Sequence, residues 1–363
     1  MTYLNLQTKI SNEDTYISSG LRLKDGLFAT FSKDYLILYY KNFSSEIIKF
    51  YYDKENYTDI KNVKQLKNGK ILCCNEKLFV VNYDIKSKKI DFKIIELPKK
   101  ENEEIEIFLD VVELHNGTIL GITLDSIYKI KITDENNEFT PIYKIPEEWL
   151  VSWENKCFYN GNLDLYDLKN NKLLLHSHSY FVSQRCPRSY ASISMESKIF
   201  QDIIFIIDLT DFKVIYTEYF PNIAKIVVLN NCFCVLHSNT IFIYNINDYK
   251  TVHKIEPDIN FINKYNDNII ITLNKKKEII LYNLSDLNNI KSQTFFFKNM
   301  NRFYGINTFI FKFKSKKFAI IYYNKIYIVD FPGNFKFKPI NPKEKNNIET
   351  NDEENKNKKK KFK

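Results

Sequence analysis

Short apolar runs recur along the whole chain, and polar turns separate them. The runs are rich in Ile, Leu, Val, Phe and Tyr, which suit the pleated, half-buried surface of a β-sheet. No long segment repeats its apolar positions with the period of an amphipathic helix. The pattern therefore predicts an all-β protein with almost no helix.

A turn signal of the form Leu-x-Asn/Asp-Gly precedes three of the apolar runs, at residues 23–26, 66–69 and 114–117. Weaker copies stand at residues 229–231 and 266–268. Between the last residues of successive turns the intervals are 43, 48, 114 and 37 residues, and 114 is three times 38. The spacing predicts a repeat of about 40 residues, with two degenerate copies inside the long interval.

A second pattern, an apolar strand that ends in a polar turn, supports the same repeat. It occurs eight times, at residues 35–42, 78–85, 127–134, 163–170, 205–211, 241–248, 279–286 and 326–333. The copies at 163–170 and 205–211 fill the long interval. Each copy is expected to be the third strand of its repeat.

A period near forty residues made of short strands and tight turns is typical of a β-propeller blade. The chain is therefore expected to form a single β-propeller of four-stranded antiparallel blades over residues 1–340. A disordered Lys-rich tail is expected at residues 341–363. The repeat count favours eight blades, and seven is the alternative if the copy near residues 149–178 is not a separate blade.

The repeating unit resembles a degenerate WD repeat. The Trp-Asp dipeptide of that family survives only in altered form, as at Tyr166-Asp167, Ile207-Asp208 and Tyr244-Asn245, and its Gly-His dipeptide is missing. The family's structural Asp, His and Ser/Thr triad is therefore assigned to no residue. The resemblance implies a propeller that covers nearly all of residues 16–331.

Two segments compete to close the ring by supplying the outer strand of the last blade. Near the N-terminus, Leu4, Leu6 and Ile10 share one face of an expected strand. Near the C-terminus, residues 335–338 alternate Phe and Lys. We expect the N-terminal segment to close the ring, because Pro339 limits the rival as a hydrogen-bond donor.

The formal net charge of +9 comes almost entirely from lysine. Only four residues are arginine, namely Arg22, Arg185, Arg188 and Arg302. Arginine is the side chain that favours bidentate recognition of phosphates and bases, so nucleic acid is not an expected partner. No two arginines are adjacent, so the paired arginines of phosphoinositide-binding propellers are absent as well. High Lys, Asn, Ile, Phe and Tyr together are typical of an AT-rich genome.

The cysteines and the N-terminal segment help to predict the location of the protein in the cell. The six cysteines, Cys73, Cys74, Cys157, Cys186, Cys232 and Cys234, lie mostly in apolar strands and are expected to be buried, reduced thiols. The N-terminus has no apolar leader, and no segment is long enough to span a membrane. A cytoplasmic protein is predicted.

A nuclear location is the alternative to the cytoplasm. The basic residues Lys356, Lys358, Lys359, Lys360 and Lys361 offer a weak nuclear import signal. A solubilising Lys-rich end is the competing interpretation of the same run.

Two groups of metal-ligating residue types occur in the chain. His176 and His178 lie on one face of a strand, and Cys186 follows eight residues later. Two histidines and a thiol are zinc ligands, but a fourth ligand is not apparent. Cys232 and Cys234, followed by His237, lie in an apolar strand typical of a core. No metal site is predicted.

Catalytic chemistry is not apparent either. His115 stands in a turn, and the carboxylate pairs Glu147-Glu148 and Asp164/Asp167 lack an identifiable base or nucleophile. Known nucleophile, phosphate-binding and metalloprotease motifs are missing. The sequence therefore predicts no catalytic residue and no cofactor.

The function favoured by these observations is a non-catalytic scaffold for protein–protein interaction within a larger intracellular assembly. Protein partners are expected because a rigid disc presents several binding surfaces at once, an inference by analogy of fold. The alternative is an enzyme or small-ligand binder that uses the mouth of the central channel. Convergent charged residues at the channel would favour the alternative, and an exposed aromatic patch would favour the scaffold.

Overall fold

The structure is a computed structural model whose described elements are all β-strands. It describes residues 2–4, 6–11, 19–23, 28–31, 35–39, 45–49, 62–74, 78–84, 87, 89–95, 97, 107–133, 137–146, 163–178, 202–255, 258–276, 278–297, 308–314, 317–322, 325–330 and 337–339. The near absence of helix expected from the sequence holds for these residues. Among them there is no helix long and apolar enough to cross a membrane.

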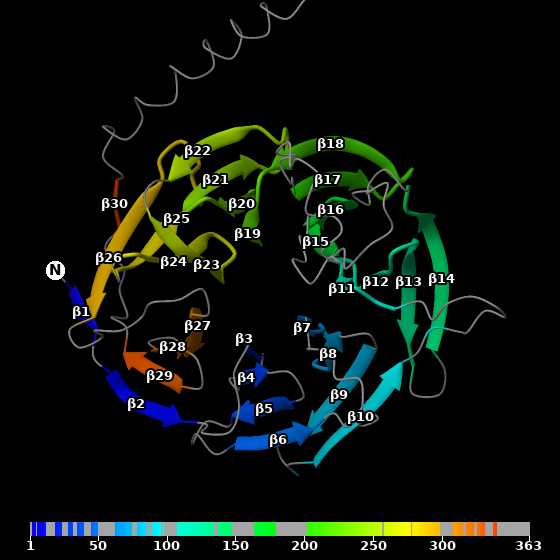
Figure 1. Ribbon diagram of the computed structural model, residues 1–363, viewed down its shortest axis with the longest axis horizontal. Helices are drawn as coiled ribbons and strands as arrows, with labels where there is room; N and C mark the ends of the chain where they lie inside the picture. Colours follow the sequence, from blue (N-terminus) through cyan, green and yellow to red (C-terminus); the bar gives the residue numbers. More distant parts are fainter. Residues whose placement is uncertain are drawn as a thin grey trace, which may run out of the picture.

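The strands form sheets arranged as a ring around a central axis (Figure 1). Six sheets have four strands each. The first sheet contains β3 (Ser19–Arg22), β4 (Phe28–Phe31), β5 (Tyr35–Tyr39) and β6 (Ser45–Lys49). The second contains β7 (Asn62–Gln65), β8 (Ile71–Cys74), β9 (Leu78–Asp84) and β10 (Lys89–Ile95). The third contains β11 (Asp110–Glu113), β12 (Ile119–Ile122), β13 (Ser126–Ile132) and β14 (Asn137–Lys144).

The next three four-stranded sheets contain β15 (Leu163–Lys169), β16 (Lys172–Ser177), β17 (Asp202–Asp208) and β18 (Lys213–Phe220); β19 (Ile223–Val228), β20 (Cys232–His237), β21 (Thr240–Asn245) and β22 (Thr251–Ile255); and β2 (Leu6–Ser11), β27 (Thr308–Lys314), β28 (Lys317–Tyr322) and β29 (Lys325–Asp330). The remaining sheet has six strands, β1 (Thr2–Leu4), β23 (Ile259–Asn266), β24 (Ile269–Asn274), β25 (Glu278–Asn283), β26 (Lys291–Phe297) and β30 (Lys338–Pro339).

This arrangement confirms the single β-propeller with four-stranded antiparallel blades, but the count of eight blades is wrong. The described residues hold six four-stranded blades and one six-stranded sheet, in which β1 and β30 both pair with β26. The alternative of seven four-stranded blades is not met either, because that remaining sheet has six strands. Its strands β23–β26 nevertheless follow the same antiparallel order as a blade.

The extra blade in the count came from β15. Residues 163–170 were expected to be the third strand of a blade, but β15 is the first strand of the sheet β15–β18. The strand β15 resembles a third strand in sequence because Asp167, near its end, forms the same kind of turn that follows a third strand. The Asp167 carboxylate accepts a hydrogen bond from the Lys169 amide, as the Asp208 carboxylate does from the Thr210 amide at the end of β17.

The N-terminal segment closes the ring, as expected. β2 pairs antiparallel with β29 as the outer strand of the sheet that ends the propeller. Just before it, β1 pairs in parallel with β26 of the neighbouring sheet, from Thr2 opposite Phe295 to Leu4 opposite Phe297. The rival C-terminal segment contributes only β30, which pairs with β26 and not with β29.

The repeated turn signal forms tight turns of one kind where the structure describes it. In two of them the glycine amide donates to the leucine carbonyl three residues earlier, at 3.0 Å for Gly69 and 2.9 Å for Gly117. Both glycines have positive φ, +92° and +87°, a conformation that costs side-chain-bearing residues energy. The turn at residues 24–26 lies outside the described residues.

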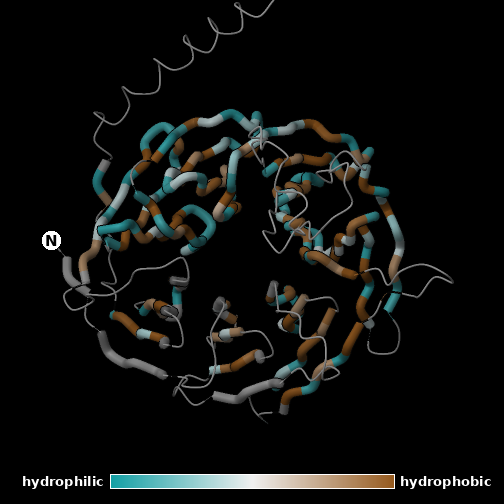
Figure 2. Tube along the Cα trace, viewed as in Figure 1, coloured by the Kyte–Doolittle hydropathy of each residue, from teal (hydrophilic) through white to brown (hydrophobic). Residues whose placement is uncertain are grey.

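The core lies between neighbouring sheets, where apolar side chains from both faces of the strands pack together. Figure 2 shows hydrophobic segments running through the strands. Cys73 and Cys74 point to opposite faces of β8 and join two different clusters, and Cys232 and Cys234 share a third. All four are free and buried, as expected. Burial raises the pKa of the Cys73 thiol far above its usual range. Cys157 and Cys186 lie outside the described residues.

Candidate functional site

The strands that lie closest to the centre of the ring are β3, β7, β11, β15, β19, β23 and β27, one from each sheet (Figure 1). Charged and polar residues on three of these strands, β7, β11 and β15, approach one another across blade boundaries. They form two groups, one joined by Asp110 and one built around Asp164. The first group joins residues of three blades, and the second lies on two strands of one blade.

Asp110 on β11 joins three blades. Its side chain is 1% exposed, and both carboxylate oxygens lie 3.0 Å from the Lys64 ammonium on β7. One oxygen also accepts a hydrogen bond from the Leu165 amide on β15, at 2.8 Å. Burial raises the pKa of Asp110, and the positive charge of Lys64 opposes that rise. Asp110 and Lys64 therefore join neighbouring blades through their hydrogen bonds and ion pair.

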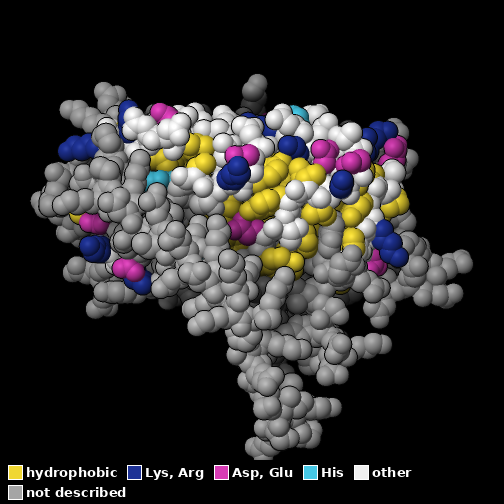
Figure 3. All heavy atoms as spheres, turned by 90° about the horizontal axis from the view of Figure 1, so that it is seen from above, with side chains coloured by type: hydrophobic (Ala, Val, Ile, Leu, Met, Phe, Trp, Pro, Cys, Tyr) yellow, Lys and Arg dark blue, Asp and Glu magenta, His cyan; other side chains and the backbone are white. Residues whose placement is uncertain are grey.

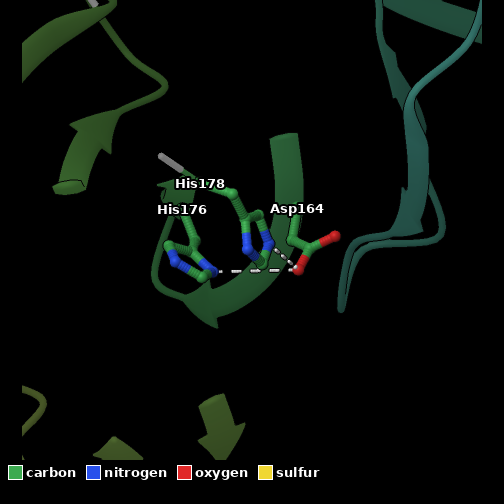
Figure 4. Close-up of side chains that lie close together, drawn as sticks. All are labelled: Asp164, His176 and His178. Carbon is green, nitrogen blue, oxygen red and sulfur yellow. Dashed lines mark hydrogen bonds and ion pairs between the residues drawn. The ribbon is translucent and has the colours of Figure 1, made fainter. Parts of the chain in front are cut away.

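The second group consists of Asp164, His176 and His178, and we call it the histidine cluster (Figure 4). Asp164 on β15 lies directly opposite His176 on β16 in the strand register. His178 follows β16 on the same face, and the two imidazole centroids are 3.8 Å apart. The nearest distances to Asp164 Oδ2 are 2.8 Å from His178 Nε2 and 3.8 Å from His176 Nδ1.

A second carboxylate orients the buried ring of the cluster. His176 is 1% exposed, and its Nε2 lies 3.4 Å from Oδ2 of Asp202 on β17. The same Asp202 oxygen accepts a hydrogen bond from the Ile223 amide on β19, at 2.6 Å, which ties the cluster to the next blade. Burial alone would lower the pKa of His176, but Asp164 and Asp202 outweigh burial and raise it.

The surroundings of Asp164 are asymmetric. Burial by itself raises the pKa of Asp164, but the two histidines overcome that effect and hold it below its usual range. The Tyr166 hydroxyl lies 3.5 Å from Asp164 Oδ2.

Lys225 on β19 is half-buried, and its ammonium lies 5.3 Å from the centre of the Phe261 ring on β23. Burial lowers the pKa of Lys225 to about 8.

The other residues singled out in the sequence lie apart from this cluster. His115 is exposed in its turn and pairs with Asp167, with Nδ1 3.5 Å from Oδ1. Cys232 and Cys234 are core residues, and His237 Nδ1 lies 2.6 Å from the Asn222 carbonyl oxygen. The remaining candidates, Glu147, Glu148, Cys186, Lys356, Lys358, Lys359, Lys360 and Lys361, lie outside the described residues.

The flank of the disc carries the largest exposed apolar side chains. On β18, the outer strand of its sheet, Ile215 is 39% exposed and Tyr219 is 58% exposed. Val252 on β22, the outer strand of the next sheet, is 38% exposed. Figure 3 looks onto the side of the ring where β18 and β22 lie, and hydrophobic side chains gather there between charged ones. Phe92 on β10, the outer strand of another sheet, is 40% exposed as well.

Sequence reasoning missed three residues of these sites: Lys64, Asp110 and Asp202. Asp110 stands alone between Leu109 and Val111, whereas Lys64 and Asp202 each have one apolar and one polar neighbour. A single charged residue at an otherwise apolar position is the signal that was available, because an ionised side chain is buried only when paired. Its partner lies on another strand, so the sequence alone does not identify it.

Comparison with solved structures shows the fold. The Pan2 WD40 domain of Neurospora crassa matches with a TM-score of 0.59 and 8% identity, over 92% of this chain and 97% of that one. The Cps50 (Swd1) propeller domain of Myceliophteria thermophila matches with a TM-score of 0.55 and 10% identity, over 89% and 99%.

Sqt1 of Saccharomyces cerevisiae matches with a TM-score of 0.51 and 10% identity, over 91% of this chain and all of that one. No protein-family model and no curated protein matches the chain. The expected resemblance to WD-repeat propellers is thus confirmed at the level of the fold.

Proposed function

We propose that this protein is a non-catalytic scaffold for protein–protein interaction, acting as a subunit or adaptor of a larger assembly. The observation that carries the proposal is the exposed apolar surface formed by Ile215, Tyr219 and Val252 on β18 and β22. A Tyr side chain exposed beside aliphatic residues is the kind of anchor that protein interfaces use. We call these three residues the flank surface.

The backbone of β18 adds a second feature to the flank surface. Within the described part of the chain, β18 pairs only with β17, so its other edge carries no ladder. An open edge strand accepts an additional strand from a partner, with main-chain hydrogen bonds supplying affinity. The exposed Ile215 and Tyr219 lie on one face of this edge and would supply specificity.

The channel residues support the scaffold over an enzyme. Lys64 and Asp110 contact each other and the backbone of neighbouring blades. A charged pair used in this way joins blades and does not await a substrate. WD40 propellers such as the matched domains are rigid platforms by architecture, which is an argument from fold alone.

The test is affinity capture from the native organism with quantitative mass spectrometry. The bait is the wild-type chain, the Ile215→Lys/Tyr219→Lys double variant or the Phe92→Lys variant. Phe92 on β10 is 40% exposed and lies on the outer strand of a different sheet, so it controls for adding a lysine to an outer edge. A true partner should be recovered about tenfold less with the double variant than with the other two.

Two results would count against the proposal. One is that no protein is enriched over an unrelated propeller bait. The other is that the double variant, shown by circular dichroism to be folded, retains every partner. Either outcome would leave the flank surface without a role in binding.

We also propose that the protein works inside the cell, because the described cysteines are buried free thiols. A fluorescent fusion should report cytoplasmic signal. Replacing Lys358, Lys359 and Lys360 with Gln would lower a nuclear fraction only if the basic run is an import signal. Secretion of the fusion would contradict the proposal.

A further inference from the structure

We propose that Asp164, His176 and His178 bind a divalent transition metal ion of the zinc class. Two imidazole nitrogens and one carboxylate oxygen are ligands that zinc takes readily. The three ligand atoms lie within 4.8 Å of one another. They come from two adjacent strands of one blade, so the sheet itself holds them in place.

The distances suit a single ion. Ligands about 2.1 Å from a tetrahedral ion lie about 3.4 Å from one another. The contacts to Asp164 Oδ2, 2.8 Å from His178 and 3.8 Å from His176, bracket that value. Small side-chain rotations would therefore bring all three atoms to coordination distance without moving the strands.

An unsatisfied nitrogen points to the ligand independently. His176 Nδ1 is buried and has no hydrogen-bond partner in the structure. With the ring hydrogen on Nε2, where Asp202 accepts it, Nδ1 carries a lone pair. That lone pair faces the Asp164 carboxylate at 3.8 Å. Two electron-rich atoms facing each other in a partly buried site repel unless a metal ion or a proton on Nδ1 lies between them.

Asp202 supplies the outer support that metal-binding histidines commonly have. A carboxylate that accepts the second ring hydrogen fixes the tautomer and the orientation of the imidazole. Asp202 is itself held by the Ile223 amide of the next blade. The Asp164 carboxylate also attracts the positive charge of Lys225 on the next blade.

An ion could reach the cluster from solvent. The side chains of Asp164 and His178 are 32% and 24% exposed, whereas His176 is buried behind them. Three protein ligands leave one tetrahedral position for water or for a fourth donor. The sequence expectation of no metal site rested on the absence of a fourth ligand beside His176, His178 and Cys186. Asp164 is a carboxylate ligand supplied by the opposite strand, and Cys186 lies outside the described residues.

The test uses untagged full-length protein, stripped with a chelator and titrated with Zn²⁺ by calorimetry and with Co²⁺ by visible absorption. Wild type should bind one equivalent of Zn²⁺, and Co²⁺ should give the intense absorption of a tetrahedral site. His178→Ala and Asp164→Asn should each weaken zinc binding at least about 100-fold. Asp202→Asn should weaken it about 10-fold, because outer partners cost about 10–100-fold when removed.

His115→Ala is the matched control, because His115 is an exposed histidine paired with a single carboxylate, Asp167. It should bind zinc as tightly as wild type. Circular dichroism and melting temperature establish that each variant is folded, which His178→Ala should be because His178 is partly exposed. No zinc uptake by wild type, or equal affinity in His178→Ala and His115→Ala, would overturn the proposal. A protonated His176 held between two carboxylates would then explain the cluster.

Discussion

At the scale of single residues, Gly69, Gly117 and Gly121 play two different roles. Gly69 and Gly117 hold positive φ in turns, with nothing within 4 Å of where a Cβ would stand. Gly121 on β12 has no such φ, but a Cβ there would lie 2.6 Å from Phe108 Cε1 and 2.7 Å from Ile130 Cδ1. The first two are needed for backbone conformation and the third for close packing.

These roles predict different responses to substitution. Gly117→Ala should lower the free energy of unfolding by about 1–2 kcal/mol through backbone strain alone. Gly117→Asn should recover much of that loss, because Asn tolerates positive φ. Gly121→Ala should cost about 1–3 kcal/mol through overpacking, and Gly121→Asn should cost more still. Urea denaturation measures all four, and recovery by Asn at both positions would contradict the distinction.

Lys225 predicts a dependence of stability on pH. Burial lowers its pKa to about 8 in the folded protein, against an ordinary value of 10.5. Between these values the unfolded chain binds more protons, so the penalty of burying the charge is full below pH 8 and fades by pH 10.5. Lys225→Met should therefore be more stable than wild type at pH 7, and the difference should shrink by pH 10. Denaturation at both pH values checks this, and a difference independent of pH would refute it.

The histidine cluster shows how far residue patterns reach. The i, i+2 spacing placed His176 and His178 on one face of a strand, and that inference was correct. Asp164 was noted only as a possible pair with Asp167, because the two are close in sequence. Its true neighbour is set by the register of β15 against β16, and a pattern within one strand does not give the register between two strands.

At the scale of elements, short turns decide which strands pair. The hairpin between β15 and β16 turns at Asn170 and Asn171, both with positive φ of 47° and 56°, and the one between β20 and β21 turns at Ser238 and Asn239, with φ of 47° and 63°. Asparagine tolerates this conformation. The chain has only eight glycines, which explains why a search for glycine turns found only some of the repeats.

Closure of the ring by β1 and β2 predicts an asymmetry between the two ends. Removing residues 1–11 deletes β2, the outer strand that pairs with β29, together with β1. The expected net loss is a few kcal/mol, after the entropy regained by the freed segment is subtracted. The truncated protein should melt several degrees lower or express insolubly.

The comparison is deletion from Asn334 onward, which removes only the two-residue strand β30 from the described sheets. That deletion should change the melting temperature much less. Thermal unfolding followed by circular dichroism measures both. Equal melting temperatures for the two truncations, or a larger drop for the C-terminal one, would refute closure by the N-terminal strand.

At the scale of the whole molecule, the propeller is held together by contacts between blades. Among the described residues, six apolar clusters each combine side chains of two neighbouring sheets. Polar links supplement them, and the Asp110–Lys64 pair spans three blades. Since each blade relies on its neighbours for a core, loss of one such link is expected to affect the whole ring.

Asp110→Ala should therefore be strongly destabilising. It removes the partner of Lys64 and leaves the Leu165 amide without its acceptor, and breaking a buried pair costs about 3–5 kcal/mol. The control is Glu138→Ala, which removes an exposed pair with Lys131 whose two side chains are 61% and 63% exposed. It should cost no more than about 1 kcal/mol. Comparable losses in the two variants by denaturant unfolding would show that Asp110 does not link the blades.

The sequence predicted the architecture of the protein better than its number of blades. The period and the strand class follow from local patterns that repeat many times, so errors in one copy are corrected by the others. The number of blades depended on one copy, β15, whose terminal Asp167 turn is shared by first and third strands. Contacts between blades, such as Lys64 with Asp110, leave no periodic trace, because each occurs once.

The pairing of β2 with β29 also has a consequence for how the protein is made. Leu6 lies opposite Val329, so the first of these strands leaves the ribosome more than 300 residues before the second. At about 5–20 residues per second, translation of that interval takes about 15–60 s. Throughout that time β2 has no partner strand in its own sheet. The nascent chain must therefore carry an incomplete ring of blades, in which β2 is unpaired in its own sheet, until synthesis of β29 allows the ring to close.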